Sequence, residues 1–378
     1  MSESIPINAD ILKWARTSIG LSIEEVAQKM RRKKEEIKDW ELGQSAPTYA
    51  QLEKLAYHIY KRPLAVFFFP DVPIEETPKT EFRTLPNTLI EQLPVEMIKL
   101  YRKAKIFQFN LEELFENAKP AEVILVDKYR LDEHTNIPLL AEKVRKDLGY
   151  SINDQFTWQS LDEAFKKWRK AFESLGVFVF KDAFHNDDFS GFCIYDNKYP
   201  IIFINNSMPD SRQIFTLFHE LGHLFYHLGG IDFRDNRVLE AIERKYFKFE
   251  MGCNKFASEI IVPQKVFDVQ NLQVSERQFQ LLANKFSVSR EVILRKYLDN
   301  GLIDNEYYRK MTEKWANQYK NRKKGGHYYY TQIAYLGNTY INLVFGKYYQ
   351  NKISAENLSS YLNIKETNIS TFEHYAFG

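Results

Sequence analysis

The pentapeptide His219-Glu220-Leu221-Gly222-His223 lies within a strongly apolar stretch of the chain. Its apolar neighbours recur at helical spacing: Ile214, Phe215, Leu217, Phe218, Leu224 and Phe225. Residues four apart on a helix lie on one face, about 6 Å from each other, so both imidazoles can bind one zinc ion. Glu220 stands beside that ion and can take a proton from the attacking water. The segment therefore predicts a buried metal-binding helix; the alternative is a helix with hydrogen-bonded structural histidines.

A zinc site of this kind needs a third protein ligand. His227 continues the spacing, but it lies eight residues from His219, about 12 Å along a helix, which is too far to share one ion. The next predicted helix has an apolar face with Glu250 at its edge and Glu259 half a turn from Glu250. Glu250 is therefore the geometric choice. The thiolate of Cys253 is the alternative, although a small buried residue is the simpler interpretation.

The periodicity elsewhere predicts an α+β fold with a small sheet. Strands are expected at 177–180, 192–195 and 201–204. Helices are expected at 95–118, 136–148, 158–175, 211–228 and 238–262, followed by a helical pair over 275–302. Short helices with tight breaks are expected over 8–62.

The metal motif and the helix after it resemble the ImmA/IrrE family of bacterial zinc metallopeptidases. That family shows H-E-x-x-H and then E-x-x-A-N-x-F-A, and this chain has E-x-x-C-N-x-F-A over 250–257, with Cys253 in place of Ala. In the family the first Glu of the second motif is the third zinc ligand. The resemblance therefore implies one Zn²⁺ per chain, bound by His219, His223 and Glu250, with Glu220 as the catalytic carboxylate. Family members that act as proteases cut a partner transcriptional repressor after a stress or DNA signal.

Residues 190–192 and 201–205 resemble the edge strand of that family and the strand before its catalytic helix. An edge strand can bind a peptide through its unpaired backbone groups. Gly191 would allow close approach of that peptide, so we expect Gly191 and Phe192 to bind substrate. A glycine at an ordinary bend is the alternative.

The N-terminal segment 8–69 resembles the Xre/Cro-type helix-turn-helix. The resemblance is carried by L-S-x-E-E-V-A over 21–27, by I-x-x-W-E-x-G over 37–43 and by the helix after Pro47. In that family the second helix of the motif enters the major groove of double-stranded DNA. Ile23 occupies a position where the family usually has Gln, a phosphate or base contact.

Lysines at the start of this second helix suit contacts to DNA phosphates: Lys33, Lys34 and Lys38. Glu35 and Glu36 oppose such contacts. Residues 1–70 hold eleven Lys and Arg against nine Asp and Glu, a weak net charge of +2 for DNA binding. The alternative is a module for dimerisation or for docking a partner.

Together these features predict an N-terminal all-α helix-turn-helix bundle over 1–70 and a linker over 71–95. A zincin-like domain with a small sheet and the H-E-x-x-H helix is expected over 96–302. A basic, Tyr-rich C-terminal region follows over 303–378.

Composition limits the cellular setting. The net charge of the whole chain is +2, so any attraction to nucleic acid must be local. Two cysteines fit a reducing compartment. The longest apolar run that we find, Leu64–Phe69, is far shorter than the roughly 20 residues of a spanning helix. No signal peptide is visible, so we expect a cytoplasmic protein without membrane contact.

We therefore predict a zinc metallo-endopeptidase fused to a DNA-binding module, which regulates a mobile-element, phage or stress-response locus by cleaving a partner protein. The alternative is a non-enzymatic, autoregulating antitoxin that neutralises a co-encoded toxin, with zinc as a structural ion. A third interpretation is a peptidase with a vestigial N-terminus that binds no operator. A homodimer is compatible with each interpretation.

Overall fold

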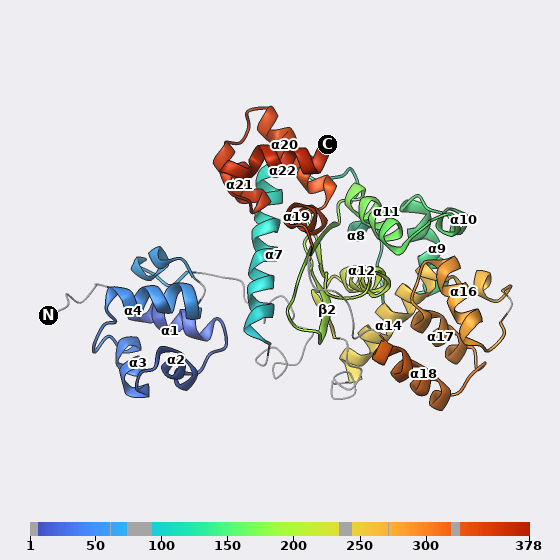
Figure 1. The fold of residues 1–378 in the computed structure, drawn as a ribbon, viewed down its shortest axis with the longest axis horizontal. Helices are drawn as coiled ribbons and strands as arrows, with labels where there is room; N and C mark the ends of the chain where they lie inside the picture. Colours follow the sequence, from blue (N-terminus) through green and yellow to red (C-terminus); the bar gives the residue numbers. More distant parts are fainter. Residues whose placement is uncertain (1–6, 61, 74–92, 234–243, 271, 319–325) are drawn as a thin grey trace. The chain divides into compact units, whose positions relative to one another are not determined.

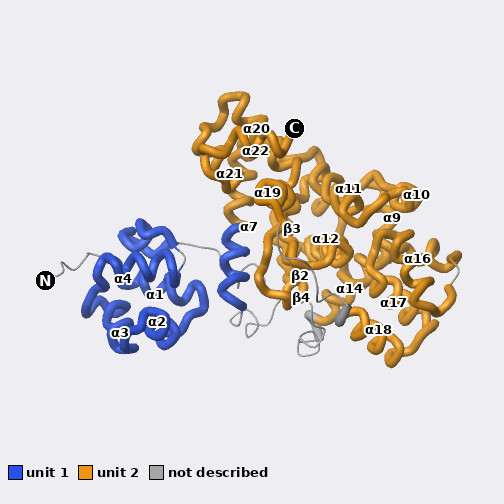
Figure 2. Tube along the Cα trace, in the orientation of Figure 1, with its two compact units in different colours: residues 1–103 blue, residues 104–378 orange. Residues whose placement is uncertain are grey.

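The computed structural model describes residues 7–60, 62–73, 93–233, 244–270, 272–318 and 326–378. The chain divides into two compact units, residues 1–103 and 104–378 (Figure 2). Helices predominate in both, and a small mixed sheet belongs to the second unit (Figure 1). The expected α+β fold is confirmed. Most of the predicted linker, residues 74–92, lies outside the described residues. Within the described part of the chain, no helix combines the length and apolarity needed to cross a membrane.

The first unit is a bundle of short helices: α1 (Ala9–Thr17), α2 (Ile23–Met30), α3 (Lys34–Glu41), α4 (Tyr49–Glu53), the π-helix η1 (Lys54–Tyr60) and the 3₁₀ turn η2 (Leu64–Phe68). Ser22 caps α2, because its hydroxyl accepts the Glu25 N–H while the Glu25 carboxylate accepts the Ser22 N–H. Arg31 ends α2 in the left-handed conformation, with φ 56°. Ile37 and Trp40 then bury one face of α3. Helices α2 and α3 form the helix-turn-helix.

Four strands form the sheet of the second unit: β1 (Phe178–Asp182), β2 (Phe189–Ile194), β3 (Ile201–Asn205) and β4 (Gly230–Phe233). Their order is β1-β3-β2-β4. Strand β1 runs parallel to β3, whereas β2 runs antiparallel to both β3 and β4. The three strands expected from the sequence are present, and β4 was not expected.

Strand β2 is an inner strand, so the expectation of an edge strand at Gly191 and Phe192 is wrong. Gly191 pairs with Ile204 of β3 on one side and with Asp232 of β4 on the other. The backbone of β2 is therefore occupied within the sheet, so the free strand edge on which we based the predicted substrate-binding role of Gly191 and Phe192 is absent there. A Cβ at Gly191 would lie 2.6 Å from Cγ2 of Thr216, so this glycine lets a helix approach the sheet closely.

That helix is α12 (Asp210–Phe225), which packs on β2, β3 and β4 and carries the H-E-x-x-H motif (Figure 1). The opposite face of the sheet is covered partly by residues 104–114 of α7 (Val95–Leu114), where Phe107 stacks on Phe180 of β1 with ring centroids 4.2 Å apart. Because both faces are covered, β2 and β3 are buried along their whole length.

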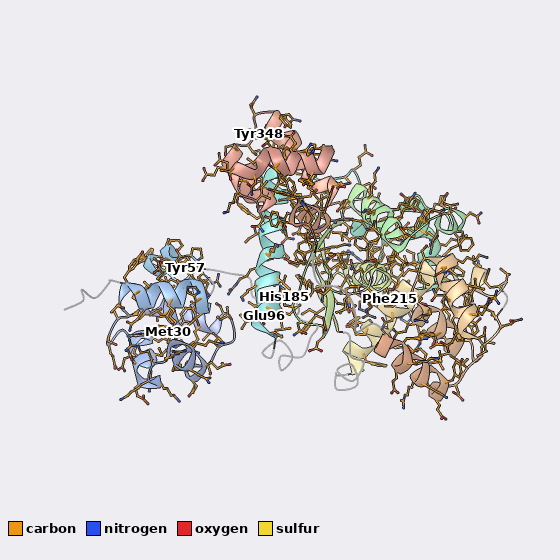
Figure 3. The ribbon with its side chains drawn as sticks, viewed as in Figure 1. Met30, Tyr57, Glu96, His185, Phe215 and Tyr348 are labelled. Carbon is orange, nitrogen blue, oxygen red and sulfur yellow. The ribbon has the colours of Figure 1, made fainter. Side chains whose placement is uncertain are left out.

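The remaining helices before the C-terminal region are α8 (Leu125–Lys128), α9 (Ile137–Asp147), α10 (Ile152–Phe156), α11 (Leu161–Ser174), α14 (Arg244–Ile261), α15 (Gln264–Phe267), α16 (Glu276–Phe286) and α17 (Arg290–Asp299). The core of the second unit lies between α11, α12, α14 and the sheet. Figure 3 shows Phe215 of α12 among the closely packed side chains of this region.

The C-terminal region forms α18 (Asn305–Gln318), α19 (Tyr328–Leu336), α20 (Asn338–Tyr349), α21 (Ala355–Leu362), η3 (Glu366–Asn368) and α22 (Ile369–Phe377). Arg169 of α11 forms a buried ion pair with Glu173 at 2.9 Å and donates to the carbonyl of Ala334 at 2.8 Å. Gly337, with φ 81°, leaves room for this guanidinium, since a Cβ there would lie 2.3 Å from Arg169 Cζ. Helix α19 is thereby fixed to α11.

Candidate metal centre

Helices α12 and α14 meet at two small residues. A Cβ on Gly222, within the H-E-L-G-H motif, would lie 3.1 Å from the Cα, Cβ and Sγ atoms of Cys253 on α14. The glycine and the cysteine thus allow the two helices to lie close together. This contact brings Glu250, one turn before Cys253, level with the histidines of α12.

The three predicted ligands come together at this contact. The Nε2 atoms of His219 and His223 are 3.1 Å apart. Glu250 Oε2 lies 3.2 Å from Nε2 of His219, and Glu250 Oε1 lies 3.2 Å from Nε2 of His223. All three residues are buried. Among the described residues they form a group able to hold a metal ion, with all ligand atoms within 4.8 Å of one another.

The hydrogen bonds of this group fit a metal ion. Nδ1 of His219 lies 3.0 Å from Oδ1 of Asn254 on α14. If Nδ1 donates to this oxygen, Nε2 keeps its lone pair directed at the centre of the cluster. Glu250 Oε1 is buried and accepts no hydrogen bond, which leaves it available for the same ion. The arrangement of two imidazoles and a carboxylate is one that zinc takes in catalytic sites.

Charge at the cluster favours an ionised third ligand. Burial raises the pKa of the Glu250 carboxyl, but the nearby imidazoles of His223 and His219 lower it by more, so that the net shift is far downward. Burial lowers the pKa of His219, and the charges of Asp232 and Glu250 reverse this and raise it. Glu250 is therefore a carboxylate at neutral pH.

Glu220 is fully buried beside the cluster. Burial raises the pKa of its carboxyl to about 8, against a smaller lowering by His223, and Asp232 raises the pKa further. A weaker lowering comes from the thiol of Cys193 on β2. A carboxyl whose pKa lies near neutrality can both accept and return a proton.

The alternative ligands are not part of this group. Nδ1 of His227 is 2.6 Å from the hydroxyl of Tyr195, and its Nε2 is 3.1 Å from the carbonyl of Val126. Glu259 accepts from Lys296 at 3.1 Å and so belongs to a separate contact. Cys253 is buried, and burial raises the pKa of its thiol well above the usual value. Its contact with Gly222 is consistent with a packing role.

Sequence reasoning missed a buried carboxylate on β4. Asp232 accepts hydrogen bonds from Nη2 of Arg212, 3.0 Å from each carboxylate oxygen, and from the hydroxyl of Thr216 at 2.9 Å. Arg212 also donates from Nε to the hydroxyl of Ser190 at 3.1 Å. Gly230, at the start of β4, lies against the ring of His223. No motif in the sequence marks these residues, because β4 is a four-residue strand without an alternating pattern.

The lysines expected to contact DNA lie at the start of α3. Lys33 is the residue before the helix, and Lys33, Lys34 and Lys38 are all exposed. Lys34 forms an ion pair with Glu24 of α2. Glu35 is exposed beside them. The expected residues thus share one exposed surface, with mixed charge.

Comparison with known families finds one match within each unit. Residues 172–297, which span β1 to α17 and include the whole cluster, match the peptidase family model described as the IrrE N-terminal-like domain. Residues 12–56 match a helix-turn-helix model. The chain thus holds one segment that is similar to the IrrE N-terminal-like domain and one that is similar to a helix-turn-helix. Both resemblances drawn from the motifs are confirmed. No match to an individual curated protein was found.

Proposed function

We propose that this IrrE-like chain is a zinc-dependent endopeptidase joined to a DNA-binding module, and that it regulates transcription in the cytoplasm by cutting a partner protein. The observation that carries the proposal is the buried group of His219, His223 and Glu250 with the Glu220 carboxyl beside it. The matches to a peptidase family and to a helix-turn-helix support the two halves of the proposal.

In this proposal His219, His223 and Glu250 hold one Zn²⁺ and leave a fourth position open, as catalytic zinc sites do. A bound zinc ion would polarise the scissile carbonyl and acidify the attacking water. Glu220 accepts a proton from that water and passes it to the leaving nitrogen. The raised pKa of Glu220 supports the delivery of the proton to the leaving nitrogen, because a carboxyl group with a pKa near neutral can hold the proton until it is transferred.

The balance of buried charge also supports a divalent cation. Three carboxyl groups are buried in this region, those of Glu220, Glu250 and Asp232. Arg212 is bonded to Asp232, and its side chain is one-third exposed, at 33%. Buried carboxylates are costly without compensating charge. Arg212 offsets the charge of Asp232, and a dication would offset the charge of Glu250 and any that Glu220 gains when it gives up its proton.

The regulatory part of the proposal rests on the helix-turn-helix over 1–70, which would carry the peptidase domain over 96–302 to an operator. The residues between them, 71–95, would act as a linker, and 303–378 as an additional helical region. A partner repressor is the proposed substrate. Cleavage would then link a cellular signal to expression of the locus.

Metal analysis of the full chain, purified without chelators, tests the ligand set. We expect one zinc ion per chain, and its loss in His219→Ala and in Glu250→Ala, because each removes one of three ligands. The matched variant Cys253→Ala should retain zinc, since the thiol contacts Gly222 rather than the ligand atoms. Zinc-free wild-type protein, or loss of zinc in Cys253→Ala with retention in Glu250→Ala, would contradict the assignment.

A further inference from the structure

Strand β4 lies along the face of α12 that carries the metal-binding histidines. Gly230 of β4 contacts His223, and Asp232 accepts a hydrogen bond from Thr216. Gly230 and Asp232 are two residues apart in the strand, so both lie on the same face of the sheet. Thr216 precedes His219 by three residues and lies on the same helix face. The carboxylate of Asp232 is thus held about one helical turn from His219.

The ion pair formed by Asp232 is asymmetric. The Asp232 side chain is 6% exposed, whereas the Arg212 side chain is 33% exposed. Water screens an exposed charge far better than a buried one. The positive charge of the pair is therefore weakened by solvent, while the negative charge acts through the protein interior. The electrostatic potential that the pair produces at the cluster is therefore negative.

Hydrogen bonding alone does not require a carboxylate at this position. Thr216 and the guanidinium of Arg212 both donate, and an amide oxygen could accept from either. What the carboxylate adds is its charge, placed near the carboxylate of Glu250 and the carboxyl group of Glu220. This placement raises the electrostatic free energy of the metal-free site and thereby favours a bound cation.

We propose that Asp232 is a positioning residue for the metal centre, which strengthens zinc binding through its negative charge, and that Arg212 limits this effect by partial neutralisation. This inference rests on the proposed function, because it assumes that the cluster holds zinc. It assigns a role to two residues of β4 and α12 that do not contact the metal. Opposite charge changes at the two positions should consequently have different effects on zinc affinity.

The test measures the zinc dissociation constant of the full chain by competition with a chromophoric chelator. Asp232→Asn, which keeps the shape and an acceptor oxygen, should raise the dissociation constant by about tenfold or more, a size typical of residues that support metal ligands. Arg212→Gln, which keeps a donor, should leave the constant unchanged or lower it. Thr216→Val keeps both charges and should bind zinc like the wild type.

A purely structural clamp predicts a different pattern. In that case Asp232→Asn and Arg212→Gln would weaken zinc binding alike, and the double variant would recover, because its two amides can bond each other. That pattern, or wild-type affinity in Asp232→Asn, would overturn the inference. Circular dichroism checks that each variant folds. If Asp232→Asn does not fold, Thr216→Val provides the test, because a loss of zinc affinity in Thr216→Val would also contradict a charge effect. Absence of zinc from the wild-type chain would instead reject the proposed function.

Discussion

Gly230 determines how closely β4 can approach the metal cluster. A Cβ at this position would lie 2.4 Å from Cγ of His223, closer than any real contact. We expect Gly230→Ala to displace the imidazole or the strand, to lower zinc occupancy and to destabilise the fold by about 1–3 kcal/mol. Zinc analysis and thermal unfolding measure both effects.

Gly346 of α20 offers a matched control, since a Cβ there would meet no atom within 4 Å. Gly346→Ala should keep zinc and stabilise its helix by about 0.5–1 kcal/mol. Equal zinc content and equal unfolding temperatures in Gly230→Ala and the wild type would show that the contact with His223 is unimportant.

The residues of the site differ in how far the sequence could predict them. His219, His223 and Glu220 follow from spacing within one helix, which is local information. Glu250 required the apolar face of the next helix, which the sequence also contains. Asp232 and Gly230 act through the placement of β4 against α12, and no local pattern encodes that placement. Asn254 stands in a recognised motif, yet its bond to His219 depends on how the two helices pack.

At the scale of elements, α3 carries the proposed DNA contact. Lys33 and Lys34 lie at its start, where a recognition helix meets DNA, and both are exposed. We expect Lys33→Ala with Lys34→Ala to weaken binding to the DNA upstream of the gene for this chain. The dependence of affinity on salt should also become less steep, by a log–log slope of about 0.9 for each phosphate that a lysine no longer neutralises. Fluorescence anisotropy over a range of salt concentrations measures both.

Lys13 of α1 provides the control for that experiment, because it is also exposed and lies outside the α2–α3 motif. Lys13→Ala should change affinity much less than the double variant. Equal reductions in affinity in the two proteins would point to unspecific attraction by the positive charge. No binding by the wild type at low salt would favour a docking module over a DNA-binding one.

Strand β4 is the element of the sheet that the sequence does not predict. Three strands were expected because Val, Ile and Phe cluster in them. Strand β4 has a glycine and an aspartate among four residues, so β-propensity gave no signal for it. Without β4, the sequence predicts β2 to be an edge strand. The error at Gly191 and Phe192 follows from that missing neighbour.

The way in which α2 begins and ends recurs at α16 and α21, each with a serine cap at its start and a left-handed residue at its end. Ser22 and Ser354 cap α2 and α21. Arg31 and Asn363 end those two helices in the left-handed conformation, with φ 56° and 51°. After each of them the next N–H bonds to the carbonyl five residues earlier. Neither turn has the glycine that usually marks such a helix end, so the likeness is visible only in the backbone.

In the whole molecule, the two proposed functions belong to separate parts of the chain. The helix-turn-helix has its own core in the first unit, and the metal cluster lies within the second. This separation predicts that changes at the cluster leave DNA binding intact. A variant that removes only the chemistry can therefore be used to ask whether regulation depends on cleavage.

Glu220→Gln is that variant, and the measurement is cleavage of a partner protein. The full chain is co-expressed with the product of the neighbouring gene, and cleavage of that product is followed by mass spectrometry. The account predicts that wild type and the exposed control Glu112→Gln cut it. Glu220→Gln should keep zinc and DNA binding but cut at least about 100-fold more slowly, because the general base is removed.

Cleavage by Glu220→Gln at the wild-type rate would contradict the proposed peptidase activity. Regulation that survives in Glu220→Gln but fails in His219→Ala would instead indicate a non-enzymatic antitoxin with structural zinc.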